Sequence, residues 1–535
     1  MRPWRLSPYP FPVAVLAFAL GGGLLGPPAA AQPAVFDDEV RQSLRSFARI
    51  FEAVQANAAD PVDSDKAIYK GAIPSMLRTL DPHSNFFDPR DFKLLREDQN
   101  GRYFGVGMMV GGQSGKVLVM HPFSGSPAYK AGLRPGDIIV QVDGKSTEGL
   151  TLTEVVDLLK GPRGTKVRVS VNRPGVEQAL DFEMTRDEIS RKSVTHAFMI
   201  RPGVAYVHIE SFNENTSREL ELAMRKLGEK DLEGLVLDLC NNPGGLLTEG
   251  VSVAERFLRK GQMVVSHKGR SSPRRPYLAG RGASAGRDYP VVVMVNKYSA
   301  SAAEIVAGAL QDHDRALIFG ESTFGKGLVQ SQFPLPENTA LLLTTARYYT
   351  PSGRLIQRDY AGVSFFEYYR RKETPAGGND VHSTDSGRTV LGGGGIEPDE
   401  KYSPPKLNAF QTRLLARAAF FEFSSSYFGG RDAKLPRDWK PDAALLEQFR
   451  AHLRKKEIRF SEAEFTDNRA FIEEQLRLEM YTIAFSKEDA DRLAVEIDPA
   501  VARAADALPK AKALAGRARE LIVRRTAPPG AAASR

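Results

Sequence analysis

The sequence predicts a multidomain α/β protein that has a helical N-terminal part, a β-rich domain, an α/β core and a helical C-terminal extension. Its 535 residues, 42% of them hydrophobic and 26% charged, are enough for about three or four globular domains. Short β-type runs separated by Gly, Pro and Asp turns lie between residues 103 and 187. Strands alternate with helices between residues 188 and 402, and helical periodicity dominates on either side.

The N-terminus has the pattern of a secretory signal. Arg2 and Arg5 precede an apolar stretch from 11 to 25, and small residues follow as far as Gln32. We therefore expect residues 1–31 to be a signal peptide and the protein to be exported to the periplasm or cell envelope. An uncleaved membrane anchor is the alternative, although glycines 21–23 and two prolines interrupt the run before it reaches the ~20 residues of a span.

Residues 37–100 are predicted to form an N-terminal helical region. Apolar residues recur there at helical spacing, and Leu80–Phe87 closes the region as a turn. His83 in this turn has no second histidine or carboxylate at metal-binding spacing, so a capping or turn role is favoured over a ligand role. No cofactor or metal is expected anywhere, because the eight histidines are scattered along the chain.

Residues 103–187 carry three β-type runs and one helical run at Leu152–Leu159. The turn Ala131–Asp137, the strand after it and Asp143-Gly144 closely resemble a PDZ domain. That resemblance implies a loop whose backbone N–H groups capture the terminal carboxylate of a peptide while the peptide adds as a strand. The residues of this predicted loop are Tyr103, Phe104, Gly105, Val106 and Gly107.

The α/β core is predicted over residues 188–402. The apolar strand 234–239 enters the turn Asn241–Gly245, and a helix follows from Leu247. A strand-to-helix turn with two glycines can point backbone N–H groups into a crevice, as an oxyanion hole requires, so Gly244 or Gly245 is expected to donate. Two polar stretches, 268–287 and 374–395, are interpreted as lids or disordered connections.

A serine and a lysine 25 positions apart, Ser301 and Lys326, suggest a Ser/Lys hydrolase. The serine lies where the apolar run 291–295 gives way to a helical pattern, and a helix N-terminus favours developing negative charge. Lys326 can act as a base only if burial lowers its pKa from about 10.4 by roughly 3 units. The apolar residues around it can supply that burial. Ser299 is the rival nucleophile, but it lies two residues outside the helix start.

Three formal motif matches compete with this interpretation. Gly320–Lys326 fits the start of a phosphate-binding loop, but Gly327 stands where Ser or Thr must hold Mg²⁺, so no nucleotide is expected. Gly282–Gly286 fits an esterase elbow without the required strand before it and helix after it. Ser403–Lys406 has Ser-x-x-Lys spacing, but two prolines preclude the helical turn that would bring the two side chains together.

Residues 403–525 are predicted to form a helical C-terminal extension, and 526–535 a disordered tail. Docking of the extension against the core and oligomerisation both remain open. The net charge of +8 comes without a run of five basic residues, so we expect no nucleic-acid partner. The single cysteine, Cys240, excludes an internal disulfide and is interpreted as a buried, inert thiol.

From about Phe47 to Asp399 the chain resembles the C-terminal processing peptidases, the tail-specific serine proteases of family S41. The resemblance rests on 80–84, the PDZ features, 238–245, 299–312 and 321–330. The resemblance implies that Ser301 is the nucleophile, that Lys326 is the general base and that Gln330 orients the lysine by accepting a hydrogen bond. It also implies that the oxyanion donors are Ala302 and one of Gly244 and Gly245, and that Asp312 is a further polar position of the site. The chain departs from the family pattern at Cys240, where arginine is usual, and at Tyr298, where glycine is common.

The expected function is therefore an exported endopeptidase that recognises protein C-termini and cleaves by a Ser/Lys acyl-enzyme mechanism. The resemblance also implies that the PDZ domain gates the active site when a tail binds. Expected partners are protein or peptide substrates with exposed C-termini, an adaptor lipoprotein and further copies of the chain. A non-catalytic PDZ scaffold and a carboxyl-terminal exopeptidase are the alternatives.

Overall fold

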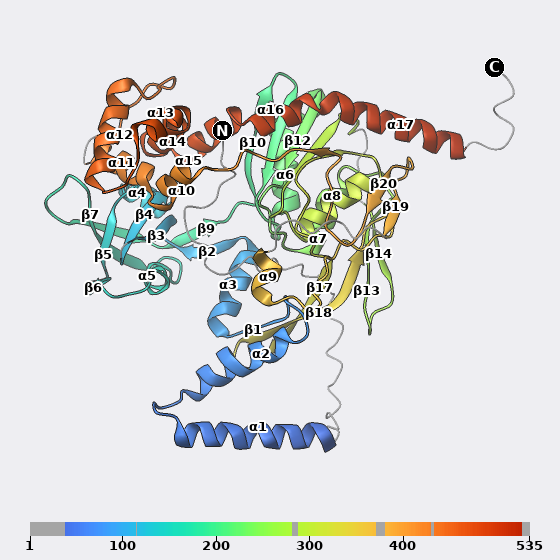
Figure 1. Cartoon of the computed structure of the whole chain (residues 1–535), viewed down its shortest axis with the longest axis horizontal. Coiled ribbons are helices and arrows are strands. Elements are labelled where there is room, and N and C mark those ends of the chain that lie inside the picture. The colour runs from blue at the N-terminus through green and yellow to red at the C-terminus, as the bar shows by residue number, and fades with distance from the viewer. Residues whose placement is uncertain (1–37, 114, 281–286, 371–379, 430–432, 527–535) are drawn as a thin grey trace.

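The computed structural model describes residues 38–113, 115–280, 287–370, 380–429 and 433–526. The predicted signal peptide and nearly all of the predicted C-terminal tail lie outside this part of the chain. Figure 1 shows N-terminal helices, a β-rich domain and an α/β core, with the last of the C-terminal helices lying across the core. The predicted multidomain α/β class is therefore confirmed. The boundaries assigned to the domains stay predictions.

A six-stranded sheet forms the centre of the α/β core. Its order is β10-β11-β12-β15-β16-β21, and all neighbours are parallel except the antiparallel pair β10 and β11. Every residue of β12 and β15 is buried, as expected for parallel strands covered on both faces. The bounds are β10 (Val194–Arg201), β11 (Val204–Ile209), β12 (Gly234–Asp238), β15 (Val291–Val295), β16 (Leu317–Gly320) and β21 (Glu400–Lys401).

Different helices cover the two faces of this sheet. Because side chains alternate along a strand, Leu235 and Leu237 pack with the cluster under α6, α7 and α8, whereas Val236 packs with the C-terminal helices. The bounds are α6 (Thr216–Lys226), α7 (Leu247–Glu255), α8 (Ala302–Asp312), α15 (Lys487–Glu496), α16 (Pro499–Asp506) and α17 (Leu508–Thr526). The C-terminal extension therefore docks on the core, which is one of the two alternatives left open above.

A second, antiparallel sheet lies beside the central one and includes a strand from the N-terminal region. Its order is β1-β18-β13-β14, with β17 also paired to β18. The stretch 80–87, expected as a turn, thus ends in a strand, and the polar stretch 268–287 contains β14. The strands are β1 (Asn85–Phe87), β13 (Met263–Lys268), β14 (Arg275–Leu278), β17 (Leu328–Leu335) and β18 (Thr339–Tyr349), and a separate hairpin comprises β19 (Val381–Ser383) and β20 (Thr389–Leu391).

The β-rich domain is a sheet of order β3-β4-β5-β7-β8, with β6 paired to β5. Helix α5 begins with a capping box in which Thr151 and Glu154 satisfy each other's backbone N–H groups. The pair β2 and β9 connects this domain to the core. The bounds are β2 (Arg102–Gly105), β3 (Met108–Gln113), β4 (Lys116–Pro122), α4 (Pro127–Ala131), β5 (Ile138–Val142), β6 (Lys145–Ser146), α5 (Leu152–Leu159), β7 (Lys166–Asn172), β8 (Leu180–Thr185) and β9 (Asp187–Ser190).

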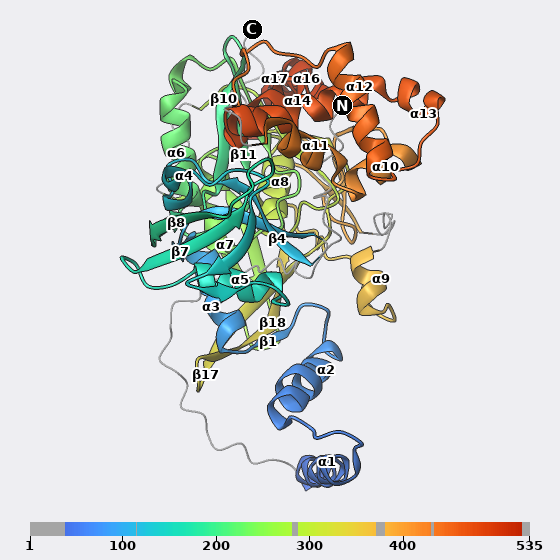
Figure 2. The same ribbon diagram turned by 90° about the vertical axis from the view of Figure 1, so that its left-hand side faces the viewer.

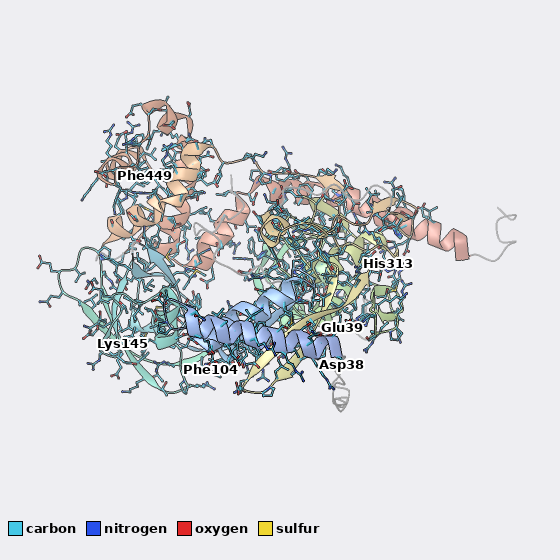
Figure 3. The ribbon with its side chains drawn as sticks, turned by 60° about the horizontal axis from the view of Figure 1, so that its bottom comes forward. Asp38, Glu39, Phe104, Lys145, His313 and Phe449 are labelled. Carbon is cyan, nitrogen blue, oxygen red and sulfur yellow. The ribbon has the colours of Figure 1, made fainter. Side chains whose placement is uncertain are left out.

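Helices dominate the two ends of the described chain. Figure 2 shows α1 set apart from the rest of the molecule, and none of its residues is buried. Phe449 marks the helical cluster formed by α10 to α14, and His313 lies in the core (Figure 3). Among the described residues, no helix has both the length and the apolarity to span a bilayer. The bounds are α1 (Asp38–Asn57), α2 (Ile73–Arg78), α3 (Pro89–Asn100), α10 (Ala409–Ala416), α11 (Ala419–Phe428), α12 (Ala443–Lys455), α13 (Glu462–Asp467) and α14 (Arg469–Ala484).

Candidate functional site

Ser301 occupies the turn between β15 and α8, at the N-terminus of the helix. Its backbone has φ 57° and ψ −113°, a conformation that a residue other than glycine rarely adopts and that is typical of functional turns. The side chain is fully buried, and its Oγ has no hydrogen-bond partner among the described residues. The hydroxyl is therefore uncommitted and lies where the dipole of α8 favours negative charge.

The rival serine is committed to the fold. Ser299 Oγ donates to the Leu239 carbonyl at 2.8 Å and accepts from the Asn296 N–H at 2.9 Å. The first bond joins the turn after β15 to the turn after β12, and the second lies within the turn after β15. Ser299 thus serves as a structural link between two neighbouring turns, whereas the hydroxyl of Ser301 remains available for chemistry.

Lys326 lies on the loop between β16 and β17 and is 1% exposed. Its Nζ donates to Gln330 Oε1 at 2.9 Å. Burial lowers the pKa of Lys326 to about 7, against the opposing effect of the carboxylates of Asp81 and Glu304. The amine can therefore be neutral near neutral pH, as a general base must be. No hydrogen bond joins it to Ser301 Oγ in this state of the protein.

Gln330 connects the lysine to the loop before β1. Its Nε2 donates to the His83 carbonyl at 2.5 Å, so the amide is oriented with its oxygen toward Lys326. The His83 backbone N–H makes the expected turn, donating to Asp81 Oδ1. However, the imidazole is also buried, and it contacts the hydroxyls of Tyr368 at 3.0 Å and Tyr369 at 3.2 Å. His83 is therefore part of the site, which its interpretation as a turn residue missed.

Three residues were expected to form the oxyanion hole. The Gly244 N–H donates to the side chain of Asn242 at 2.8 Å, so it is occupied. The N–H groups of Gly245 and Ala302 have no partner within the described part of the chain. A Cβ on Gly244 would lie 2.7 Å from Ser301 Cβ and 3.0 Å from the Ala302 nitrogen, so only glycine lets the two turns approach this closely. The geometry favours Gly245 over Gly244 as the second donor.

The departure at Cys240 has a structural explanation. The thiol is buried, and it packs in the cluster formed by alternate residues of the central sheet and by α15, α16 and α17. Burial raises the pKa of Cys240 well above its ordinary value, so the thiol is inert, as expected. An arginine at this position would have to place its charge beneath the C-terminal helices.

The predicted tail-binding loop is shorter than expected, because 102–105 pair with β9 as strand β2. Tyr103 and Phe104 are therefore strand residues, and burial raises the pKa of Tyr103 to about 12. The turn itself consists of Val106 and Gly107, whose N–H groups have no partner among the described residues. Gly107 has φ 75°, and β3, which follows it, has no strand on its outer side. Gly105 ends β2 before this turn.

Asp312 is not brought to the dyad. It lies at the opposite end of α8, about 16 Å from Ser301 at 1.5 Å per residue. Its carboxylate pairs with the buried Arg354 at 2.8 Å and accepts from the N–H of the half-buried Ser352 at 2.9 Å. The geometry indicates that Asp312 anchors the loop after β18 and has no contact with the reacting groups.

Besides His83, the site contains Glu304 and Tyr348, which the sequence motifs do not predict. The side chain of Glu304 accepts from the backbone N–H groups of both Ser301 and Lys326, and the Tyr348 hydroxyl approaches the carbonyls of the same two residues. The spacing Ser-x-x-Glu at the start of α8 has the form of a capping box and could have identified Glu304. Tyr348 lies on β18, and nothing in the local sequence marks it.

The arrangement is suited to acyl transfer. An unpaired hydroxyl and the unpaired N–H of Ala302 lie at the N-terminus of α8, and the unpaired N–H of Gly245 lies in the turn after β12. A buried amine able to lose its proton belongs to the loop whose backbone is hydrogen-bonded to the same first turn of α8 through Glu304. The loop 320–327 leads into strand β17 and not into a helix, which excludes phosphate binding of the P-loop kind. Within the described residues no group of three or more His, Cys, Asp and Glu side chains could hold a metal ion.

Comparison with known proteins gives consistent matches. Residues 203–364 match the model of peptidase family S41, and residues 124–173 match that of the PDZ domain. A carboxy-terminal-processing protease of Bartonella bacilliformis is 42% identical over 320 residues, covering 59% of this chain and 73% of that protein. The carboxy-terminal processing protease CtpB of Bacillus subtilis is 34% identical over 337 residues, covering 62% and 70%. The solved structure of a photosystem II D1 C-terminal processing protease is 32% identical and covers 69% of this chain and 91% of its own, with a TM-score of 0.36.

Proposed function

Because this chain belongs to the carboxy-terminal-processing proteases of peptidase family S41, we propose that Ser301, Lys326 and Gln330 carry out its reaction. The protein is a C-terminal processing serine protease whose PDZ domain recognises protein C-termini. The observation that carries the residue assignment is the pairing of the unbonded Ser301 hydroxyl with a buried lysine whose pKa is about 7. Gln330 fixes the direction of that lysine.

The reaction follows from these groups. Ser301 Oγ attacks the scissile carbonyl carbon, and its proton passes to the neutral Nζ of Lys326. The N–H groups of Ala302 and Gly245 donate to the developing oxyanion. Lys326 then gives the proton to the leaving amine as the C–N bond breaks, which leaves an ester on Ser301. A water molecule loses a proton to Lys326 and attacks the ester carbonyl. Lys326 then returns this proton to Ser301 Oγ as the acyl–oxygen bond breaks, which releases the new carboxyl terminus and restores the neutral amine.

The direct test uses the chain from residue 32 onward and an unfolded substrate with an apolar C-terminus. Products are measured by mass for the parent, Ser301→Ala and Lys326→Ala. Internal fragments from the parent alone support the proposed dyad and endoproteolysis. Release of single residues or short peptides from the C-terminus would favour the exopeptidase alternative, and cleavage that persists in Ser301→Ala would reject the nucleophile.

The gating role of the PDZ domain is part of the same proposal. Ser301 and Lys326 are at most 1% exposed, and no hydrogen bond joins their side chains, so substrate entry requires a rearrangement. Binding of a tail at Val106 and Gly107 supplies the trigger, since this turn leads directly into β3, beside the β2 and β9 connection to the core. A non-cleavable tail peptide should then accelerate hydrolysis of a separate short peptide, and an unchanged rate would count against gating.

Export, an adaptor and self-association are further proposals. The basic and apolar pattern of residues 1–31 supports export to the periplasm or envelope, with the uncleaved anchor as the alternative. The intact mass of the protein recovered from the envelope distinguishes a chain that begins near residue 32 from one that keeps its leader. Light scattering with and without a candidate lipoprotein tests whether the chain assembles with itself or with an adaptor.

A further inference from the structure

Glu304 is a fully buried carboxylate three residues after Ser301 on the first turn of α8. It accepts four hydrogen bonds: from the N–H groups of Ser301 at 2.7 Å, Gly325 at 2.7 Å and Lys326 at 2.9 Å, and from the Thr323 hydroxyl. All four partners are donors, so the ionised carboxylate is the form that the geometry satisfies. Burial raises the pKa of Glu304 against the effect of these donors.

The four donors come from two separate parts of the core. Ser301 belongs to the turn after β15, whereas Thr323, Gly325 and Lys326 belong to the loop after β16. A helix-capping carboxylate normally satisfies only the start of its own helix. Here one oxygen, Oε2, accepts from both the Ser301 N–H and the Lys326 N–H. The carboxylate therefore fixes the backbones of the proposed nucleophile and base relative to each other.

Tyr348 also links Ser301 to Lys326, through the backbone carbonyls of the two residues. Its hydroxyl lies 3.2 Å from the Ser301 carbonyl and is also hydrogen-bonded to the Lys326 carbonyl. Ser301 and Lys326 are thus joined through their N–H groups by Glu304 and through their carbonyls by Tyr348. Only Glu304 adds a charge, and this difference allows positioning and electrostatics to be separated by experiment.

We propose that Glu304 is a positioning residue that holds Ser301 and Lys326 in register and whose negative charge, together with that of Asp81, favours the protonated form of Lys326. The proposal rests on the roles proposed above for those two residues. The charge reaches Lys326 through a dry interior, where an anion favours the ammonium form. The other titratable groups that interact with Lys326 or Glu304 are Asp81, His83, Tyr348 and Tyr368, and Arg358 acts on His83. They come from the loop before β1, from β18 and from the segment after it.

The test compares pH profiles of kcat/KM for the parent, Glu304→Gln and Glu304→Asp. Glu304→Gln removes the charge, so the acid limb moves to lower pH by roughly one unit, and kcat falls at least about tenfold as two donors lose their acceptor. Glu304→Asp keeps the charge but shortens the reach, so kcat falls while the acid limb stays. Tyr348→Phe should behave like Glu304→Asp, because it loosens the positioning without changing the charge.

Glu219→Gln is the matched control. Glu219 on α6 also accepts from two backbone N–H groups, those of Ser193 at 2.8 Å and Val194 at 3.0 Å, but it has no contact with the dyad. We expect Glu219→Gln to leave both the acid limb of kcat/KM and the value of kcat unchanged.

If Glu304→Gln does not fold, Glu304→Asp and Tyr348→Phe still test the positioning role, because a normal kcat in both variants overturns it. A folded Glu304→Gln with an unshifted acid limb overturns the electrostatic role. In either case, loss of cleavage in Ser301→Ala shows that the proposed function itself stands.

Discussion

Replacing Gln330 by glutamate is the most informative perturbation of the proposed base. Gln330 Oε1 accepts from Lys326 Nζ at 2.9 Å, and its Nε2 donates to the His83 carbonyl. Gln330→Glu is nearly isosteric and places a negative charge within hydrogen-bond distance of the lysine. The carboxylate stabilises the ammonium, so the proton that Lys326 must lose to act as a base is held more tightly.

The magnitude follows from the parent value. With a pKa of about 7, roughly half of Lys326 is neutral at pH 7. An adjacent carboxylate raises a lysine pKa by about 1 to 3 units, and a shift of about 2 leaves roughly 1% of the amine neutral at pH 7. We therefore expect kcat/KM at pH 7 to fall about 50-fold and to recover substantially near pH 9.5, because the neutral fraction recovers there.

The assay is the pH dependence of peptide hydrolysis, and Gln330→Met is the control. Methionine also loses the bond to the His83 carbonyl but adds no charge, so its acid limb stays near that of the parent while kcat falls. Thermal unfolding of each variant verifies that the fold persists over the pH range. If Gln330→Glu lowered kcat/KM by the same factor at every pH, without recovery at alkaline pH, the argument that Lys326 must be neutral to react would be refuted.

Three further predictions concern the base, the tail site and the C-terminal helices. The kcat/KM of the parent should rise with pH and reach half of its maximum near pH 7, because Lys326 loses its proton as the pH passes its pKa of about 7. A midpoint above pH 9 would contradict this. Gly107→Val should weaken binding of a tail peptide about tenfold or more by calorimetry, because its Cβ would lie 2.5 Å from Ser126 Cβ. Ala504→Asp should lower the free energy of unfolding in urea by about 3 kcal/mol or more by burying a carboxylate under α16, whereas the exposed Ala502→Asp should change it little.

The order and class of the elements could be predicted from the sequence because the patterns involved are local. Five consecutive buried residues in β15, followed by a helix, are read directly from the apolar run 291–295. The capping box at Thr151 likewise marks the start of α5. The sequence predicts a turn where β1 lies, because this strand has only three residues and pairs with β18, more than 250 positions away. A three-residue strand carries no period of its own, so only its distant partner defines it.

The candidate site likewise has residues that the sequence identifies and contacts that only the fold creates. Ser301 and Lys326 are recognisable because their chemistry is rare and a family pattern surrounds them. The choice of Gly245 over Gly244 depends on the Asn242 side chain, which occupies one N–H and leaves the other unpaired. The tyrosines that contact the His83 ring lie on α9 (Phe365–Arg370), more than 280 positions away. Sequence spacing gives no information about such contacts, because the fold brings these residues together.

The side chains of Ser301 and Lys326 are not hydrogen-bonded to each other, so catalysis must begin with a rearrangement. Ser301 Oγ has no partner, and Lys326 Nζ is bound to Gln330, so proton transfer between the dyad residues requires Lys326 to turn toward the serine. Glu304 and Tyr348 hold the backbones of Ser301 and Lys326 in place. The rotation is therefore confined to the Lys326 side chain and to the residues that hold Gln330. Gln330 is held by the carbonyl of His83, whose ring is bound by Tyr368 and Tyr369 of α9. A displacement of α9 would therefore be transmitted through His83 to Gln330, the acceptor that holds the Lys326 amine away from the serine.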